Sequence, residues 1–129
     1  MIKGTAKATG RLLVVHWHAV VLKGLAAWIS HEPYVELVGV ASNCEDALDI
    51  AAELHPDLVL LGYSTPDMGG IVATRHLIEM RGETRVILLG VSGGSERRAE
   101  AIESGAVDYV LLDTPPWEIA ATLRRLVEE

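Results

Sequence analysis

The sequence is short of cysteine, of long apolar runs and of basic charge. Its single cysteine, Cys44, cannot form an internal disulfide. Its neighbours Asn43 and Glu45 supply no positive charge that would lower the thiol pKa, so we expect a reducing, cytoplasmic setting. No apolar stretch approaches the roughly 20 residues of a membrane-spanning helix, and the amino terminus lacks the apolar core of a signal peptide. These absences argue against a disulfide-stapled, membrane-inserted or secreted protein.

Acidic residues outnumber basic ones, 18 to 11, which gives the 129-residue chain a formal net charge of −7. Because affinity for nucleic acids comes largely from Lys and Arg that neutralise phosphates, we expect no direct nucleic-acid binding by this segment. Half of the residues are hydrophobic, which is enough to bury a core without metal ions. The composition therefore predicts one globular domain.

Residues 1–10 are small, polar and aperiodic, and we interpret them as a flexible leader before a single domain of residues 11–129. From there, strand-length apolar runs alternate with segments of helical period, which predicts five βα units and a parallel sheet covered on both faces. The strands are expected at 12–15, 36–40, 58–61, 85–89 and 109–111, and the helices at 20–30, 45–54, 71–80, 95–104 and 117–127. Ser42 or Asn43 and Ser95 are expected to cap the second and fourth helices, Gly105 to follow the fourth, and Pro115 and Pro116 to introduce the fifth.

From Arg11 to Glu129 the chain resembles response-regulator receiver domains, especially those at the front of NarL/LuxR-type transcription factors. The resemblance is carried by LLVVHWHAVVLKGL, VGVASNCEDALDIAAELHPDLVLLGYSTPDMGG, TRVILLG and ESGAVDYVLLDTPPWEI. It implies a three-layer α/β/α, flavodoxin-like fold with a five-stranded parallel sheet in the order 2-1-3-4-5. It also implies that a DNA-binding domain follows Glu129 in a longer parent chain.

Working receivers of this family accept a phosphoryl group on an aspartate after the third strand, with Mg²⁺ held by an acidic pair after the first. The resemblance puts the acidic pair on His16 and Trp17, the acceptor on Gly62, the switch Ser or Thr on Gly90, and the phosphate-binding lysine on Leu112. Glycine has no nucleophile, tryptophan offers Mg²⁺ no oxygen ligand, and leucine cannot neutralise a phosphoryl charge. We therefore expect no aspartyl phosphorylation at this site and no catalytic activity.

Two other residues near this site have unremarkable interpretations. Asp67 lies five residues beyond Gly62 and is expected to be a solvated turn residue. Tyr109 matches the aromatic residue that changes rotamer in working receivers. Since Gly90 has no hydroxyl to couple it to phosphorylation, we expect a partly buried strand tyrosine.

With Gly62 and Gly90 both lacking side chains, a small cavity for a metabolite or nucleotide is an alternative to a site that is simply filled in. Its candidate residues lie after the strands: His16, His18, Ser64, Ser92, Gly93 and Gly94. His16 and His18 are two apart, but no Cys or carboxylate nearby completes a metal site, so we expect no metal ion or cofactor.

The first predicted helix carries one charged residue, Lys23, where a surface helix normally has a full polar face. Its Val20, Leu22 and Trp28, together with Trp117 of the fifth helix, are candidates for a homodimer interface. The alternative is a first helix buried more deeply by the leader. We thus expect a phosphorylation-independent receiver that acts through homodimerisation, with ligand sensing as the second hypothesis.

Overall fold

Strands and helices alternate along the chain in the computed structural model, which describes residues 9–128. The elements are β2 (Gly10–Val15), α1 (Ala19–Ile29), β3 (Val35–Ala41), α2 (Cys44–Leu54), β4 (Leu58–Gly62), α3 (Gly70–Met80), β5 (Arg85–Gly90), α4 (Gly94–Ser104), β6 (Asp108–Leu111) and α5 (Pro116–Glu128). Every expected strand and helix is present, and each end lies within two residues of its expected position. None of the helices among these residues has the length and apolar character needed to cross a membrane.

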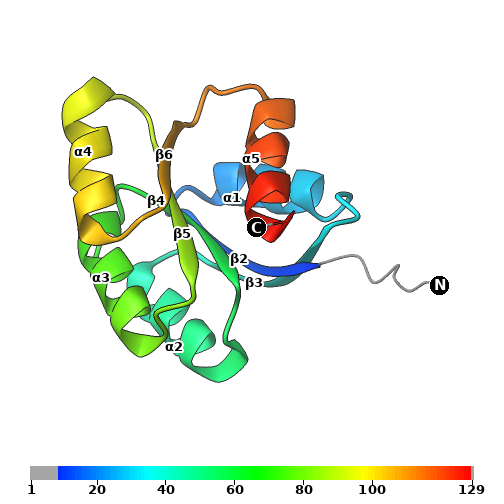
Figure 1. Ribbon diagram of the computed structural model, residues 1–129, viewed down its shortest axis with the longest axis horizontal. Helices are drawn as coiled ribbons and strands as arrows, with labels where there is room; N and C mark the ends of the chain where they lie inside the picture. Colours follow the sequence, from blue (N-terminus) through cyan, green and yellow to red (C-terminus); the bar gives the residue numbers. More distant parts are fainter. Residues whose placement is uncertain (1–8, 129) are drawn as a thin grey trace.

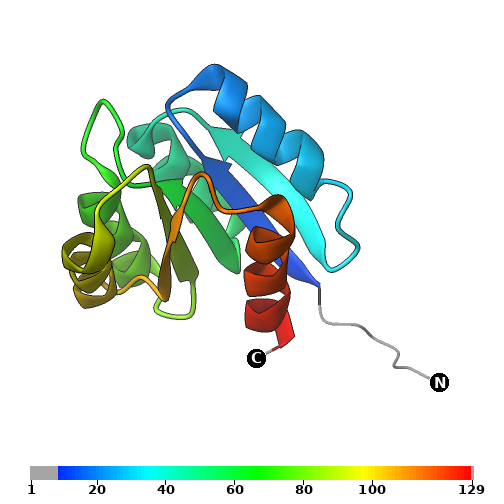
Figure 2. The ribbon, with the colours of Figure 1, turned by 90° about the horizontal axis from the view of Figure 1, so that it is seen from above.

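The five strands form one parallel sheet in the order β3-β2-β4-β5-β6. This is the predicted order 2-1-3-4-5, and the flavodoxin-like fold is confirmed. Helices α1 and α5 cover one face, and α2, α3 and α4 cover the other (Figures 1 and 2). The strand order reverses between β2 and β4, because the chain leaves β2 toward one edge and returns through β4 toward the other.

The strands lack polar alternation because both of their faces are buried. Along β2, Leu13 and Val15 pack in the core beneath α2, α3 and α4, whereas Leu12 and Val14 pack in the core beneath α1 and α5. All four side chains are at most 1% exposed. Burying each such side chain stabilises the fold by roughly 1.5–3 kcal/mol, so the two cores fix the sheet on which the site is built.

The helix boundaries show one capping prediction right and another wrong. Asn43 caps α2, since its side chain accepts a hydrogen bond from the Asp46 N–H at 2.8 Å. Ser95 does not cap α4: it lies inside the helix, and Gly93 is the N-cap residue with no side-chain hydrogen bond. Gly93 and Gly94 have φ of +117° and +40°, a region that disfavours residues with a Cβ, so glycine begins this helix.

The amino-terminal boundary lies slightly earlier than expected. Gly10 is the first residue of β2 and is buried, and a Cβ on it would lie 2.7 Å from Cγ2 of Val127. The sheet therefore includes Gly10, which the composition of residues 1–10 had suggested was part of the leader. The rest of that predicted leader, except Thr9, lies outside the described residues.

Candidate functional site

A pocket of about 190 Å³ opens at the carboxyl ends of β2, β4 and β5. We call it the carboxyl-edge pocket; its lining residues are His16, Trp17, Gly62, Tyr63, Ser64, Leu89, Gly90, Val91 and Arg97. It includes the ends of β2 and β4, the point where the strand order reverses and where ligands bind in open α/β sheets. The predicted strand ends and the family resemblance had singled out five of these residues: His16, Trp17, Gly62, Ser64 and Gly90. Tyr63, Leu89 and Val91 gave no separate chemical signal.

His16 is a buried and neutral wall of the carboxyl-edge pocket. Its backbone N–H continues the sheet by donating to the Ala41 carbonyl at 3.1 Å, and its side chain is only 6% exposed. The His18 N–H donates to Nδ1 of His16 at 3.1 Å, which assigns the ring proton to Nε2. Burial, and next the nearby His18, lower the pKa of His16 from its ordinary 6.5. Trp17 stacks beside it with ring centroids 6.1 Å apart.

Gly62 ends β4 directly beside His16, but the surrounding space does not require glycine. A Cβ built there would lie 3.4 Å from Cδ2 of His16 and 3.5 Å from the carbonyl oxygens of Ser64 and Val15. These are ordinary van der Waals distances. The position therefore has room for a Cβ.

Gly90, at the end of the adjacent β5, is enclosed by Tyr109. A Cβ on Gly90 would overlap the Tyr109 hydroxyl and lie 2.6 Å from its Cζ. The tyrosine ring is directed inward and is 6% exposed, and its hydroxyl donates a hydrogen bond to the Ser92 carbonyl. Tyr109 is thus more deeply buried than predicted, and it lies against the position that the resemblance assigns to the switch residue.

Tyr63 links the end of β4 to helix α4. Its hydroxyl donates to Oε1 of Glu100 at 2.5 Å, and its ring meets Tyr109 edge-on with centroids 5.9 Å apart. The hydrogen bond to Glu100 is the main cause that raises the Tyr63 pKa from its ordinary 10.0. The guanidinium of Arg97 lies over the same ring, 4.6 Å from its centroid. These contacts fix α4 relative to the carboxyl-edge pocket.

Several predicted site residues do not line this pocket. Ser92, Gly93 and Gly94 are exposed at the start of α4 and in the loop before it. His18 is exposed beside the pocket and orients His16 through its backbone N–H. Leu112 packs against the core beneath α1 and α5. Only His16 and Ser64 of the predicted ligand residues therefore meet in one cavity.

Asp67 is exposed as expected, but it also has a structural role. Its carboxylate accepts hydrogen bonds from the N–H groups of Cys44 at 3.1 Å and Glu45 at 2.8 Å, at the start of α2. Desolvation is the largest single influence and raises the pKa of Asp67, but the backbone hydrogen bonds together, that from Glu45 foremost, outweigh it and lower the pKa overall. The loop after β4 is thereby anchored to α2.

The four predicted interface residues divide into two pairs. Val20 is 72% exposed and Trp117 is 71% exposed, in the first turns of α1 and α5. Leu22 and Trp28 are partly buried and pack against the core beneath these helices. Val20 and Trp117 are therefore the members of this set that remain free for a partner.

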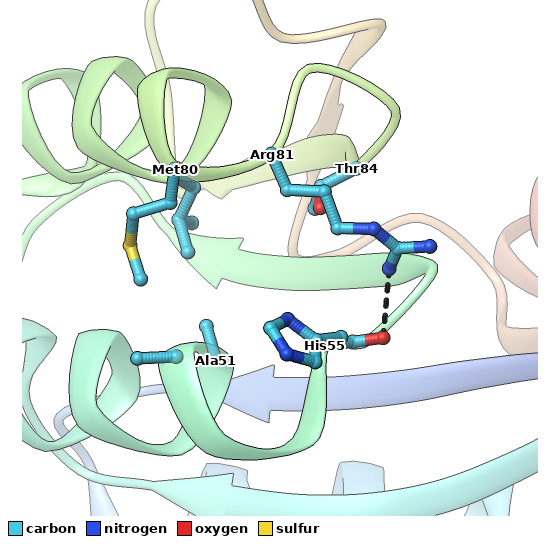
Figure 3. Close-up of a pocket in the computed structure, with 7 residues that line it drawn as sticks. Ala51, His55, Met80, Arg81 and Thr84 are labelled. Carbon is cyan, nitrogen blue, oxygen red and sulfur yellow. Dashed lines mark hydrogen bonds between the residues drawn. The ribbon is translucent and has the colours of Figure 1, made fainter.

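A second cavity of about 250 Å³ lies between the carboxyl-terminal ends of α2 and α3, where Met80 and Arg81 face Ala51 and His55 (Figure 3). Arg81, the arginine that lines this second cavity, already has partners: it donates to the His55 carbonyl at 2.8 Å and forms an ion pair with Glu83 at 3.4 Å. Across residues 9–128, no three His, Cys, Asp or Glu side chains are arranged to share a metal ion. The carboxyl-edge pocket is thus the better candidate site.

Comparison with known proteins places this architecture in a family. Residues 12–124 match the response regulator receiver domain. The chain belongs to the response regulator receiver family. The receiver domain is 35% identical over 112 residues to the transcriptional regulatory protein YhcZ of Bacillus subtilis, covering 87% of this chain and 52% of that protein. It is 32% identical over 114 residues to the nitrate/nitrite response regulator protein NarL of Escherichia coli K12, covering 88% of this chain and 53% of NarL.

A solved LuxR-family two-component response regulator from Aurantimonas sp. SI85-9A1 has the same fold, with a TM-score of 0.88, 29% identity, and coverage of 93% of this chain and 86% of that one. The NarL/LuxR-type affiliation implied by the sequence is confirmed. This receiver domain spans about half the length of YhcZ and NarL. Two other similar proteins are named protein-glutamate methylesterases, and the match covers about a third of their length.

Proposed function

We propose that this receiver domain works in signal transduction and transcription regulation without aspartyl phosphorylation. The observation that carries the proposal is Gly62 at the end of β4, where the family's acceptor aspartate is expected. The carboxyl-edge pocket supports it, because none of its lining residues carries a carboxylate that would accept a phosphoryl group or hold Mg²⁺. Its contribution to the parent protein is then binding rather than catalysis, and DNA binding belongs to a domain after Glu129.

The packing of Tyr109 against Gly90 supports a fixed conformation. A tyrosine that already occupies the inward position, with its hydroxyl bonded to the Ser92 carbonyl, needs no phosphoryl group to draw it there. Asp108 further ties the two helices that flank β6, through Arg98 of α4 at 2.9 Å and Arg125 of α5 at 3.9 Å. We expect this side of the domain to present one surface at all times.

The first experiment is a challenge with Mg²⁺ and acetyl phosphate or beryllofluoride, followed by intact-mass measurement and two-dimensional NMR. We expect no mass increase, and no shift of the Gly62, Gly90 or Tyr109 amide signals beyond the shift given by the same concentration of sodium acetate, the hydrolysis product of acetyl phosphate. A receiver that retains its acceptor aspartate, treated in parallel, confirms that the reagents are active. A stoichiometric phosphoryl adduct on this chain would overturn the proposal.

We also propose that the domain acts as a homodimer through α1 and α5. These helices share one face of the sheet, and their first turns present the exposed side chains of Val20 and Trp117. Beside Trp117, a depression of about 270 Å³ is lined in part by Tyr34, Ala120 and Ala121, whose small alanine side chains leave room for a partner's side chain. Exposed aromatic side chains of this kind are common anchors of protein interfaces.

Light scattering at several protein concentrations tests the homodimer. We expect a dimer that Trp117→Ala and Val20→Glu each weaken by tenfold or more, since both remove apolar contact at the proposed interface. Val72→Glu is the matched control: it is an exposed valine in the first turn of α3, on the opposite face, and its substitution leaves the dimer unchanged. A chain that stays monomeric at all concentrations contradicts this part of the proposal.

A further inference from the structure

The carboxyl-edge pocket is a positively charged site with apolar walls. Arg97 is the only permanently charged residue among those that line it, and no lining residue is acidic. We infer that this pocket binds a small monocarboxylate with a compact apolar body, whose carboxylate is held by the Arg97 guanidinium and the Nε2–H of His16. This site goes beyond the phosphorylation-independent homodimer proposed above, and either can fail without the other.

The Arg97 side chain is held in place by Tyr63 and has no carboxylate partner among the described residues. Its guanidinium is stacked over the Tyr63 ring, 4.6 Å from the centroid, and the Glu100 carboxylate beside it already accepts the Tyr63 hydroxyl. Within residues 9–128, no carboxylate oxygen lies within ion-pairing distance of Arg97. A guanidinium presents its N–H groups in a fork that matches a carboxylate, so a ligand carboxylate is a suitable partner.

His16 supplies a second donor. Its Nδ1 is occupied by the His18 N–H, and in the part of the chain that the structure describes no group accepts from its Nε2–H. No side-chain nitrogen or oxygen there is both fully buried and without a partner, so Nε2 is reachable from outside. A solvent-accessible N–H of this kind can donate to a ligand oxygen in place of water. Because the imidazole is neutral, it does not need a second negative charge on the ligand.

The size and walls of the pocket restrict the rest of the ligand. Its volume of about 190 Å³ is below the roughly 300 Å³ at which pockets for drug-sized molecules begin, which favours a ligand smaller than a nucleotide. The rings of Trp17 and Tyr63 and the side chains of Leu89 and Val91 supply apolar surface. A compact aromatic or branched aliphatic acid fits this combination better than an inorganic anion.

NMR titration of the domain with sodium benzoate, benzamide and inorganic phosphate tests the ligand class. We expect benzoate to saturate with a dissociation constant of about 1 mM or below, and to shift the Gly62 and Gly90 amides and the Trp17 indole. Benzamide has the same shape without the charge and is expected to bind at least about tenfold more weakly, because it lacks the charge-assisted hydrogen bonds. Equal binding of benzamide, tighter binding of phosphate, or shifts elsewhere would overturn the inference.

Two pairs of variants separate charge from shape. Arg97→Met keeps the aliphatic stem and is expected to weaken benzoate binding about tenfold or more, whereas Arg75→Met, an exposed substitution on α3, leaves it unchanged. Gly62→Asp and Gly62→Asn add side chains of equal size where there is room for a Cβ. We expect the aspartate to bind benzoate at least about tenfold more weakly than the asparagine, and equal affinities would overturn anion recognition.

Discussion

Gly62 and Gly90 end neighbouring strands of the same sheet, yet the structure leaves room for a Cβ at only one of them. At Gly62 a Cβ would meet its nearest neighbours at 3.4 and 3.5 Å. At Gly90 it would overlap the hydroxyl of Tyr109. Packing therefore requires glycine at the end of β5, but does not require it at the end of β4.

This difference divides the carboxyl edge of the sheet into a filled half and an open half. On the side of β5 and β6, the Tyr109 ring takes the space beside Gly90 and meets Tyr63 edge-on. On the side of β2 and β4, the space beside Gly62 remains part of the pocket walled by His16, which extends to Leu89, Gly90 and Val91 at the end of β5. The filled half supports the proposed fixed conformation, and the open half supports the proposed binding site.

The largest expected effect is at the filled half. Gly90→Thr forces a branched side chain into the Tyr109 ring, and overpacking of this kind typically costs about 1–3 kcal/mol of unfolding free energy. We expect the variant either to lose that stability or to expel the tyrosine, which would then become solvent-exposed. Urea unfolding measures the first outcome, and NMR of the Tyr109 ring protons measures the second.

A double-mutant cycle with Tyr109→Ala is the control for Gly90→Thr. Removing the ring creates the space that threonine needs, so the two substitutions together are expected to cost less than the sum of the single costs, by at least about 0.5 kcal/mol. Additive costs would show that Tyr109 and Gly90 are independent, and the proposed division of the edge would be wrong.

The sequence predicted which residues lie at the carboxyl edge of the sheet, but not how their side chains pack. Periodicity and the family resemblance placed His16, Gly62 and Gly90 after their strands, because strand ends in a parallel sheet converge. Neither could reveal that Tyr109 fills one glycine position and not the other, since this depends on a side-chain rotamer set by tertiary packing. The Ser95 cap was wrong for a related reason: serine is a good cap in general, but the backbone here turns through positive φ at Gly93 and Gly94.

An intermediate effect is expected at the loop that borders the open half. Asp67→Asn removes the charge and one of the two acceptor oxygens that bind the N–H groups of Cys44 and Glu45, and the loss of one such hydrogen bond typically costs about 1 kcal/mol. The pKa of Asp67 is lowered by folding, so this stability is present above the ordinary carboxyl pKa of 3.8 and is lost as pH falls through the folded value. Urea unfolding of both proteins should therefore differ at pH 7 and converge in acid.

The exposed Asp49 on α2 offers a control for Asp67→Asn. Asp49→Asn removes the same charge without a hydrogen bond among those found in residues 9–128, and is expected to change the unfolding free energy by less than about 0.5 kcal/mol. If both variants lose equal stability, overall charge rather than the anchoring of the loop explains the effect.

The smallest effect on stability is expected at the open half, where Gly62→Asp finds room. We expect a smaller cost at pH 7 than for Gly90→Thr, because a Cβ at position 62 meets its nearest neighbours at 3.4 Å or more and overlaps none of them. The new carboxylate lies beside His16 and favours the charged imidazole, so the His16 pKa rises from its lowered native value. NMR titration of the His16 ring protons measures the change, with Gly62→Asn as the uncharged control.

The pH dependence of the unfolding free energy is a second, independent test of the Gly62 position. In the unmodified chain the lowered His16 pKa means that the folded state resists protonation, so its stability falls as pH drops below the ordinary value of 6.5. In Gly62→Asp the imidazolium gains a partner, and this loss in acid becomes smaller than in Gly62→Asn. If instead Gly62→Asp destabilised the domain as much as Gly90→Thr, glycine would be required by packing at both strand ends, and the carboxyl-edge pocket would not be the open half of this edge.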